Sequence, residues 1–160
     1  MRIIAELEKA QAETYIEIAA CAAKNSPCLK SQRGAVIVLD DVVIGAGNNH
    51  PPDGSKCKTC LRKEHPEKTY TEPCRALHAE EAALLAAYKN GHAELEEAVM
   101  YHIKVKDGKK VRSGKPSCTI CAKLILAAGI KEFILWHEEG LTAYTAKENY
   151  ELSLKSLDND

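Results

Sequence analysis

The order of its predicted elements constrains the fold of this 160-residue chain more than any other feature of the sequence. Residues 34–47, GAVIVLDDVVIGAG, hold two runs of mainly β-branched residues joined at Asp40-Asp41, which predicts a β-hairpin. Two strands followed by alternating helices and strands indicate one sheet covered by helices, an α/β layered domain. The later elements expected from periodicity and stop signals are a helix at 78–90, a strand at 98–106, a helix at 118–129, a strand at 131–136 and a weaker helix at 143–157.

Two further segments are predicted before residue 78, a helix and a long loop. Apolar residues at helical spacing in residues 3–24 predict a first helix that ends near Asn25, because Pro27 opposes its continuation. Cys21 is expected on the buried face of this helix as a packing residue. Residues 48–74 hold four prolines and little periodicity, which predicts a long loop that is functional or held by other contacts.

Composition and charge argue against several classes of function. The formal net charge is −1, so no overall field attracts the chain to nucleic acid or to an anionic membrane, and neither is expected as a partner. No stretch approaches the roughly 20 apolar residues that span a bilayer. Acidic residues at short intervals in residues 1–26 differ from the unbroken apolar run of a signal peptide. A single domain over residues 1–160, located in the cytoplasm, is therefore expected.

Seven cysteines in a chain expected to be cytoplasmic favour metal binding or catalysis over disulfides. Cys118 and Cys121 form a C-x-x-C pair at the start of one predicted helix, and His78 stands at the start of another. Residues i and i+3 of a helix share a face, and a helix N-terminus favours thiolates, so the two sulfurs suit a tetrahedral Zn²⁺. With His78 they predict a zinc site of three protein ligands, whose fourth position is open as in catalytic sites.

Glu80 follows His78 by two residues and so does not share its helical face, which favours an acid–base role over a ligand role. Zinc lowers the pKa of a bound water toward about 7, and a carboxylate in the first helical turn can take that proton and deliver it to a substrate. Glu81 is interpreted as a solvated residue that favours the helix dipole. A histidine at a helix start often caps it, and a lone C-x-x-C can serve packing or redox chemistry. Their occurrence together predicts a catalytic zinc.

The motifs HAE at 78–80 and PSCTICAKLILAAGI at 116–130 resemble the zinc-dependent cytidine/deoxycytidylate deaminase superfamily. SPCLKSQRGAVIV, GNNHPPDG, CLRKEH and CRALHAEEAAL extend the resemblance over about residues 26–135 and make it closest to the deoxycytidylate deaminase branch. The resemblance implies a three-layer α/β/α fold, with a mixed central sheet of about five strands and helices on both faces. It also implies a homo-oligomer, either a dimer or a hexamer.

The chain departs from the family pattern in three places. A serine separates the motif's proline from Cys118, where the family's proline directly precedes the cysteine. In the loop NNHPPDG, Asn48 replaces an aromatic residue and His50 replaces a glycine. The segment 102–116, with a turn expected at 107–108, is longer than the usual link. The cysteine spacing is intact, so these changes concern the substrate more than the metal.

The resemblance implies hydrolytic deamination of a cytosine nucleotide, dCMP to dUMP and ammonia, with Glu80 as the proton carrier. It aligns Asn49 with a residue that contacts the sugar, and it makes the backbone N–H groups of Ala79 and Cys118 candidates to stabilise developing charge. Arg33 is a candidate for a phosphate. Further candidates, each also explicable as a surface or core residue, are Lys30, Lys56 and Lys58 for the phosphate and Trp136 and His137 for the base.

A second cysteine cluster is implied by the same resemblance. Cys57 and Cys60 form another C-x-x-C inside the long loop, and Cys28 and Cys74 flank that loop in the sequence. Members of the deoxycytidylate branch often carry a structural zinc at matching places, and a four-cysteine site would hold the loop in order. The thiols could instead be unrelated, or a histidine (His50 or His65) could complete the site in place of Cys28.

Three other functions stay open from the sequence. A deaminase of another ring, such as cytidine, guanine, adenosine in tRNA or a riboflavin precursor, would use the same zinc site. A tRNA substrate predicts a basic face, which the balanced charge does not favour. A non-catalytic zinc-binding interaction module would have no use for Glu80. A thiol redox protein using Cys118 and Cys121 would leave His78 and Glu80 unexplained.

Overall fold

The computed structural model describes residues 1–65 and 74–156. Within them, a seven-stranded sheet has the order β1-β7-β6-β4-β2-β3, and β5 pairs with β4. The helices are α1 (Glu6–Lys24), α2 (Leu61–Glu64), α3 (Ala79–Lys89), α4 (Thr119–Ala127) and α5 (Ala146–Lys155). The strands are β1 (Arg2–Ile3), β2 (Gln32–Leu39), β3 (Val42–Asn48), β4 (Val99–Lys106), β5 (Lys109–Val111), β6 (Glu132–His137) and β7 (Gly140–Thr145).

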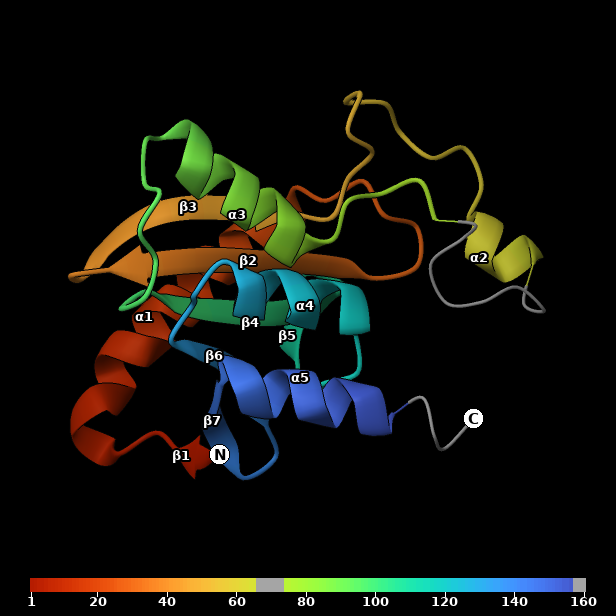
Figure 1. Ribbon diagram of the computed structural model, residues 1–160. Coiled ribbons are helices and arrows are strands. Elements are labelled where there is room, and N and C mark those ends of the chain that lie inside the picture. The colour runs from red at the N-terminus through yellow and green to blue at the C-terminus, as the bar shows by residue number, and fades with distance from the viewer. Residues whose placement is uncertain (66–73, 157–160) are drawn as a thin grey trace.

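The helices form a layer on each face of the sheet. Helix α1 covers one face, while α3, α4 and α5 cover the other, and the short α2 stands apart from both layers (Figure 1). This confirms the predicted three-layer α/β/α fold. Five strands have six or more residues and correspond to the expected sheet of about five, and β1 and β5 are short additions.

The sheet is mixed, as predicted. Strands β2 and β3 form an antiparallel hairpin whose turn residues Asp40 and Asp41 have φ of 49° and 63°. Aspartate tolerates this left-handed region better than most residues, and two such residues in succession suit a two-residue hairpin turn. Strand β4 is antiparallel to β2 but parallel to β6, and α4 lies in the connection between β4 and β6.

Strand β2 supplies both hydrophobic cores. Its side chains alternate, so that Ala35 and Ile37 pack in the core beneath α3 and α4, whereas Val36 and Val38 pack in the core beneath α1. An unbroken run of apolar residues is therefore required in this strand, because neither face of the sheet is open to water there.

Two glycines let helices rest directly on the sheet. A Cβ atom at Gly34 would lie 2.0 Å from the backbone oxygen of Ala19 in α1, and one at Gly47 would lie 2.5 Å from the backbone nitrogen of Ala83 in α3. Any larger residue would push the helix away. The contact at Gly47 matters for the site described below, because it seats the N-terminal half of α3.

The N-terminal segment differs from the sequence prediction. Arg2–Ile3 pairs with β7 as a strand, so the first helix begins at Glu6 instead of residue 3. The prediction that Cys21 is buried was wrong, because this side chain is exposed. The buried stripe of α1 runs through Ala12, Tyr15, Ile16, Ala19, Ala20 and Ala23.

The C-terminal segment also differs. Residues 143–145 were expected to open the last helix, but they pair with β6 as the end of β7, and α5 begins at Ala146. The expected turn at 107–108 joins β4 to β5, which accounts for the long segment before the C-x-x-C helix. Pro66 and Pro73 of the predicted long loop lie outside the described residues.

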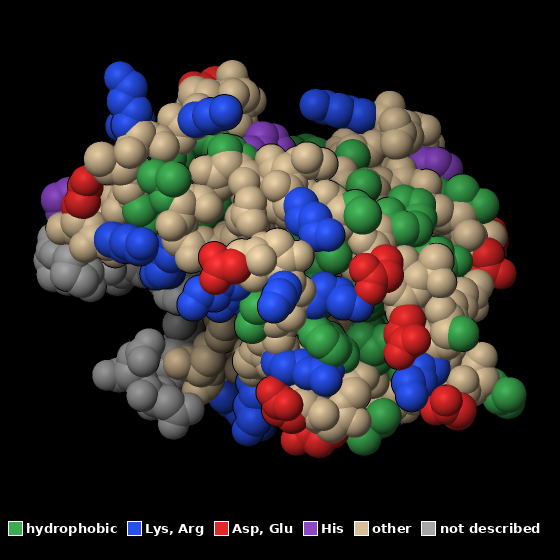
Figure 2. Space-filling view, turned by 180° about the vertical axis from the view of Figure 1, so that it is seen from behind, with side chains coloured by type: hydrophobic (Ala, Val, Ile, Leu, Met, Phe, Trp, Pro, Cys, Tyr) green, Lys and Arg blue, Asp and Glu red, His purple; other side chains and the backbone are tan. Residues whose placement is uncertain are grey.

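In the described part of the chain, each helix is too short or too polar to cross a membrane. Figure 2 shows Lys and Arg side chains interspersed with Asp and Glu over the face seen from behind. This mixing on one face matches the formal net charge of −1.

Candidate active site

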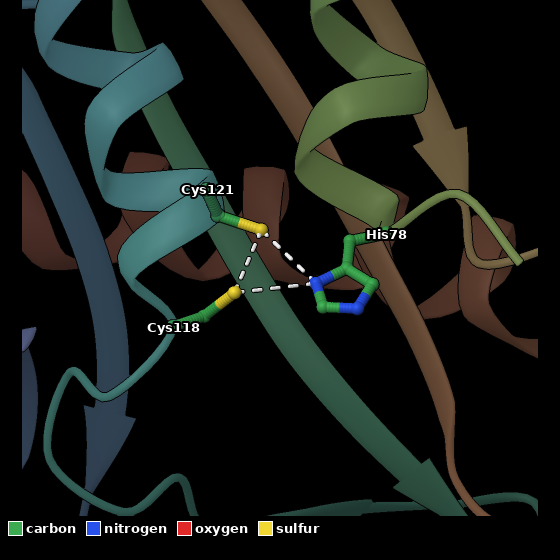
Figure 3. Close-up of side chains that lie close together, drawn as sticks. All are labelled: His78, Cys118 and Cys121. Carbon is green, nitrogen blue, oxygen red and sulfur yellow. Dashed lines mark hydrogen bonds between the residues drawn. The ribbon is translucent and has the colours of Figure 1, made fainter. Parts of the chain in front are cut away.

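Three metal-ligand side chains meet where two helices begin. His78 is the N-cap residue of α3, Cys118 is the N-cap residue of α4, and Cys121 lies in the first turn of α4. The Nδ1 atom of His78 lies 3.1 Å from the Cys121 sulfur and 3.3 Å from the Cys118 sulfur, and the two sulfurs are 3.3 Å apart (Figure 3). The structure thus brings together the three residues that the sequence predicts as ligands.

The three donor atoms fit a zinc ion. Usual Zn–N and Zn–S distances of about 2.1 and 2.3 Å place the donors of a tetrahedral site about 3.6 to 3.8 Å apart. The present donors need to separate by only about half an ångström to reach this spacing. One imidazole and two thiols also form a donor set that zinc prefers over harder cations such as Mg²⁺.

The two thiols differ in acidity. The hydrogen bond between them is the main reason that the pKa of Cys118 is lowered to about 5, with a further contribution from His78. The same hydrogen bond, together with burial, raises the pKa of Cys121 well above its usual value. The pair therefore carries one negative charge at neutral pH, which prepares it for a cation.

The two acids in the first turn of α3 have different tasks. Glu81 accepts a hydrogen bond of 2.6 Å from the backbone nitrogen of His78, so it caps the helix and is not simply a solvated residue. Glu80 is buried and lines the same cavity as the three ligands. Burial raises the pKa of Glu80, but His102, the backbone, His78 and Arg33 together outweigh burial and lower it. Glu80 is therefore ionised at neutral pH, the state in which a carboxylate can accept a proton.

The site opens into a cavity of about 340 Å³, a volume in the usual range for small-molecule sites. Four basic residues line it: Lys30, Arg33, Arg62 and Lys115. Glu80 is the one acidic residue among the described residues of this lining. Arg62 and Lys115 were missed in the sequence, where isolated basic residues give no signal. Lys56 and Lys58 are not among the lining residues.

Asn49 also lines the cavity, but most of its amide is already engaged. Its Oδ1 atom accepts hydrogen bonds from the Ser26 hydroxyl at 2.7 Å and from the Arg33 backbone nitrogen at 2.8 Å. Its Nδ2 atom donates to the Ser31 carbonyl at 2.9 Å. An amide has two donor hydrogens, so one N–H remains for a ligand. Asn49 therefore ties the loop before β2 to the end of β3 as well as facing the cavity.

His102 is a cavity residue that the sequence analysis missed. It lies on β4 with 3% of its surface exposed, and its Nε2 atom is 3.8 Å from Oε1 of Glu80. The only available signal was a histidine inside the apolar run VMYHIKV. Such a residue is hard to distinguish from a core histidine before the partner across the cavity is known.

Three other predicted substrate residues lie outside the cavity lining. Ala79 is fully buried as the first residue of α3. Trp136 packs its ring against the guanidinium of Arg112, 3.3 Å from the ring centroid. Nδ1–H of His137 donates to the carbonyl of Ser113 at 2.9 Å. Trp136 and His137 therefore support the cavity-lining segment 113–118 from behind, instead of lining the base pocket as predicted.

Apart from Cys21 in α1, four further thiols remain, and they do not form a cluster. Among the described residues, His78, Cys118 and Cys121 are the one group of three or more potential ligands with donor atoms within 4.8 Å of one another. Three of the other cysteines (Cys28, Cys60 and Cys74) line the cavity, and Cys57 does not. All four are half-buried free thiols. The second zinc site stays a prediction from the family resemblance.

A three-layer α/β/α domain with a His-Cys-Cys site at two helix starts, and a buried glutamate beside it, has the architecture of the zinc deaminases. Those enzymes hold Zn²⁺ with such a ligand set and use a glutamate that is not a ligand as the general acid–base. The family model "Cytidine and deoxycytidylate deaminase zinc-binding region" matches residues 9–137. The chain belongs to this family.

Comparison with known proteins gives the same family. The chain is 31% identical over 130 residues to a deoxycytidylate deaminase of Mycobacterium phage D29, covering 76% of this chain and 91% of that protein. It is 30% identical to a deoxycytidylate deaminase of Schizosaccharomyces pombe over 82% of this chain but 38% of that protein.

Solved structures share the fold. The apo dCMP deaminase of cyanophage S-TIM5 superposes with a TM-score of 0.54 at 24% identity, covering 76% of this chain and 79% of that one. A cytidine deaminase of Burkholderia pseudomallei gives a TM-score of 0.59 at 17% identity, covering 86% and 94%.

Proposed function

We propose that this protein is a zinc-dependent deaminase that converts dCMP to dUMP and ammonia. The observation that carries the proposal is the Glu80 carboxylate, buried beside His78, Cys118 and Cys121 in a cavity whose other charged lining residues are basic. Relatives about 30% identical over most of this chain are named deoxycytidylate deaminases, which favours this substrate.

The chemistry divides between the metal and the chain. Zinc bound by the three ligands supplies Lewis acidity that activates water for attack on C4 of the cytosine ring. Glu80 accepts one proton of that water and delivers it to ring N3. It then accepts the second proton, from the oxygen added at C4, and passes it to the amino group, so that the C4–N bond breaks and ammonia leaves. The N–H group of Cys118, which lines the cavity, is the helix-start donor available to charge that develops during attack, and the family resemblance adds the N–H of Ala79 behind the lining. The remaining N–H of Asn49 is the donor available to the sugar.

The basic lining of the cavity supports a phosphorylated substrate. Lys30, Arg33 and Lys115 place positive charge around a cavity whose acid, Glu80, belongs to the reaction. A 5′-phosphate gains from such a cluster, whereas a free nucleoside does not. Lys115→Ala should therefore raise KM for dCMP more than KM for deoxycytidine, because only dCMP loses a charge partner.

The substrate is tested by ammonia release from dCMP, deoxycytidine, cytosine, guanine and adenosine with zinc-loaded protein. Release from dCMP with the highest kcat/KM supports the proposal. Preference for another ring would keep the zinc–glutamate chemistry and overturn the substrate. Absence of release from every compound by fully loaded protein would contradict the deaminase function itself and favour a non-catalytic zinc-binding module.

A second, structural zinc is part of the proposal. Its support is the family resemblance at Cys28, Cys57, Cys60 and Cys74, three of which line one cavity. The four sulfurs do not lie within 4.8 Å of one another in the structure, so they have to move closer to bind one ion. The double variant Cys57→Ser/Cys60→Ser should reduce the bound zinc from two ions per chain to one. A wild-type content of one zinc per chain would overturn this part.

We also infer that the protein forms a homo-oligomer, a dimer or a hexamer. An apolar groove between α3 and α4 supports this, since Leu85, Tyr88 and Leu124 are each exposed by more than 40%. Light scattering after size exclusion measures the mass directly. A change of Leu85 to glutamate should lower that mass, and a monomeric wild-type protein would contradict the inference.

A further inference from the structure

His102 is a deeply buried titratable side chain that the proposed reaction does not use. It stands on β4 opposite Ala35 of β2, and it faces the layer formed by α3 and α4. Neither Nδ1 nor Nε2 has a hydrogen-bond partner among the described residues. Leaving buried polar atoms unpaired is unfavourable, so an imidazole that served only to fill space would be a poor choice at this position.

The surroundings of His102 leave Glu80 as its natural partner. Its Nε2 atom is 3.8 Å from Oε1 of Glu80, and both side chains are buried in the wall of one cavity. Its ring also contacts Phe133, with the ring centroids 6.0 Å apart, which offers no hydrogen-bond acceptor in its side chain. A closer approach of about 0.8 Å would make the 3.8 Å contact an ordinary N–H···O hydrogen bond.

The ring is uncharged at neutral pH. Burial is the main cause that lowers the pKa of His102 to about 4. A neutral imidazole has one N–H donor and one acceptor nitrogen, and the position of Glu80 selects Nε2 as the donor. A neutral imidazole can donate a hydrogen bond to a carboxylate without adding positive charge next to the zinc site.

We propose that His102 is a positioning residue that donates a hydrogen bond from Nε2–H to Oε1 of Glu80. The bond fixes one carboxylate oxygen against the sheet and leaves the other free to accept and release protons. His102 acts only through Glu80 and does not itself carry a proton to the substrate. The proposal rests on the acid–base role of Glu80 in the proposed function and adds a partner that orients it.

Two substitutions separate positioning from packing. In His102→Gln, the side-chain amide places an N–H donor near the position of Nε2, whereas His102→Leu fills the space without a donor. For zinc-loaded protein acting on dCMP, we expect kcat of the Leu variant to fall about 10- to 100-fold, while KM and zinc content stay near the wild-type values. The Gln variant should recover most of the lost kcat. Equal loss in both variants, an unchanged kcat in the Leu variant, or an effect confined to KM would overturn the proposal.

A spectroscopic measurement tests the same bond without activity. The ring ¹⁵N signals of His102 in zinc-loaded protein, assigned by their loss in His102→Gln, should show the neutral Nε2–H tautomer. They should shift when Glu80 is changed to glutamine, because the charged acceptor is lost. An Nδ1–H tautomer, or signals unaffected by the Glu80 change, would overturn the proposal. If wild-type protein deaminates none of the substrates, the proposed function fails, and the ¹⁵N spectra still decide whether this hydrogen bond exists.

Discussion

Cys118 occupies an N-cap position, where serine, threonine or aspartate is usually found, and its side chain makes no capping hydrogen bond. The residue at the start of α4 therefore suits a metal ion better than it caps the helix. In metal-free protein, Cys118→Ser should leave the stability unchanged or raise it by up to about 1 kcal/mol, because a hydroxyl caps better than a thiol. In the presence of zinc, the same change should lower stability relative to wild type, because one ligand is weakened. Thermal unfolding with and without chelator measures both effects, and a variant that is less stable in both states would contradict the account.

Burial of His102 makes the free energy of unfolding depend on pH, with lower stability in acid. The unfolded chain protonates this histidine near pH 6.5, but the folded protein does so only near a pKa of about 4. Between these values the unfolded state binds more protons, so stability is full above pH 6.5 and falls as the pH drops toward 4. The loss attributable to His102 should be on the order of 3 kcal/mol.

Denaturant unfolding from pH 4 to 8 measures this loss. His102→Gln is the control, since every other titrating group, including the zinc ligands, is present in both proteins. The difference between the two proteins then reports His102 together with its effect on the pKa of Glu80. The difference between the two curves should flatten above pH 6.5 and change below it. A difference that does not depend on pH would show that His102 titrates as it does in the unfolded chain.

At the scale of elements, the contact between β3 and α3 sets the position of the catalytic helix. In Gly47→Ala, the added Cβ would lie 2.5 Å from the Ala83 nitrogen, and backbone atoms cannot move aside as a flexible side chain can. We expect a loss of at least about 1 to 3 kcal/mol in unfolding free energy, together with weaker zinc binding, because α3 carries His78. Gly114→Ala is the matched control for stability, since its new methyl group would meet nothing within 4 Å. Equal stability of the two variants would contradict the packing argument.

Elements with strong local signals were predicted from the sequence. The hairpin of β2 and β3 has two apolar runs and a turn of two aspartates, and α3 and α4 have apolar bodies followed by Gly91 and Gly129, both at positive φ. Strands β1 and β7 were missed because their evidence is not local. Two residues at the N-terminus become a strand only by pairing with residues 142–143.

The same distinction applies to the site. His78, Cys118 and Cys121 stand in two short motifs whose spacing matches helix geometry, so they could be recognised before the structure was known. Lys115 and His102 depend on which segments face the cavity, and that follows from the order of strands in the sheet. The burial predicted for Cys21 was wrong for a related reason. A helix rich in alanine gives a weak periodic signal, so the sequence does not locate its buried face to within one residue.

For the whole molecule, zinc joins two helices that are far apart in the sequence. Removing the metal should therefore lower the melting temperature by about 5 to 10 °C when zinc had been present at about 100 times its Kd. Calorimetry before and after chelation measures the shift. His78→Ala should lose the part of the shift that comes from the His78 site and keep only what the proposed second zinc contributes, whereas Glu80→Gln should retain the whole shift, because Glu80 is not a ligand. A shift that is undiminished in His78→Ala would place the stabilising metal elsewhere.

The proton-carrying role of Glu80 is tested by comparing wild-type protein with Glu80→Gln at matched zinc content, using dCMP as the substrate. Glutamine keeps the size of the side chain and removes its ability to exchange a proton. We expect ammonia release by wild type, a fall of about 10²- to 10⁴-fold or more in kcat for the variant, and an unchanged metal content. A variant that releases ammonia as fast as wild type while holding the same zinc would contradict the assignment of Glu80 as the proton carrier.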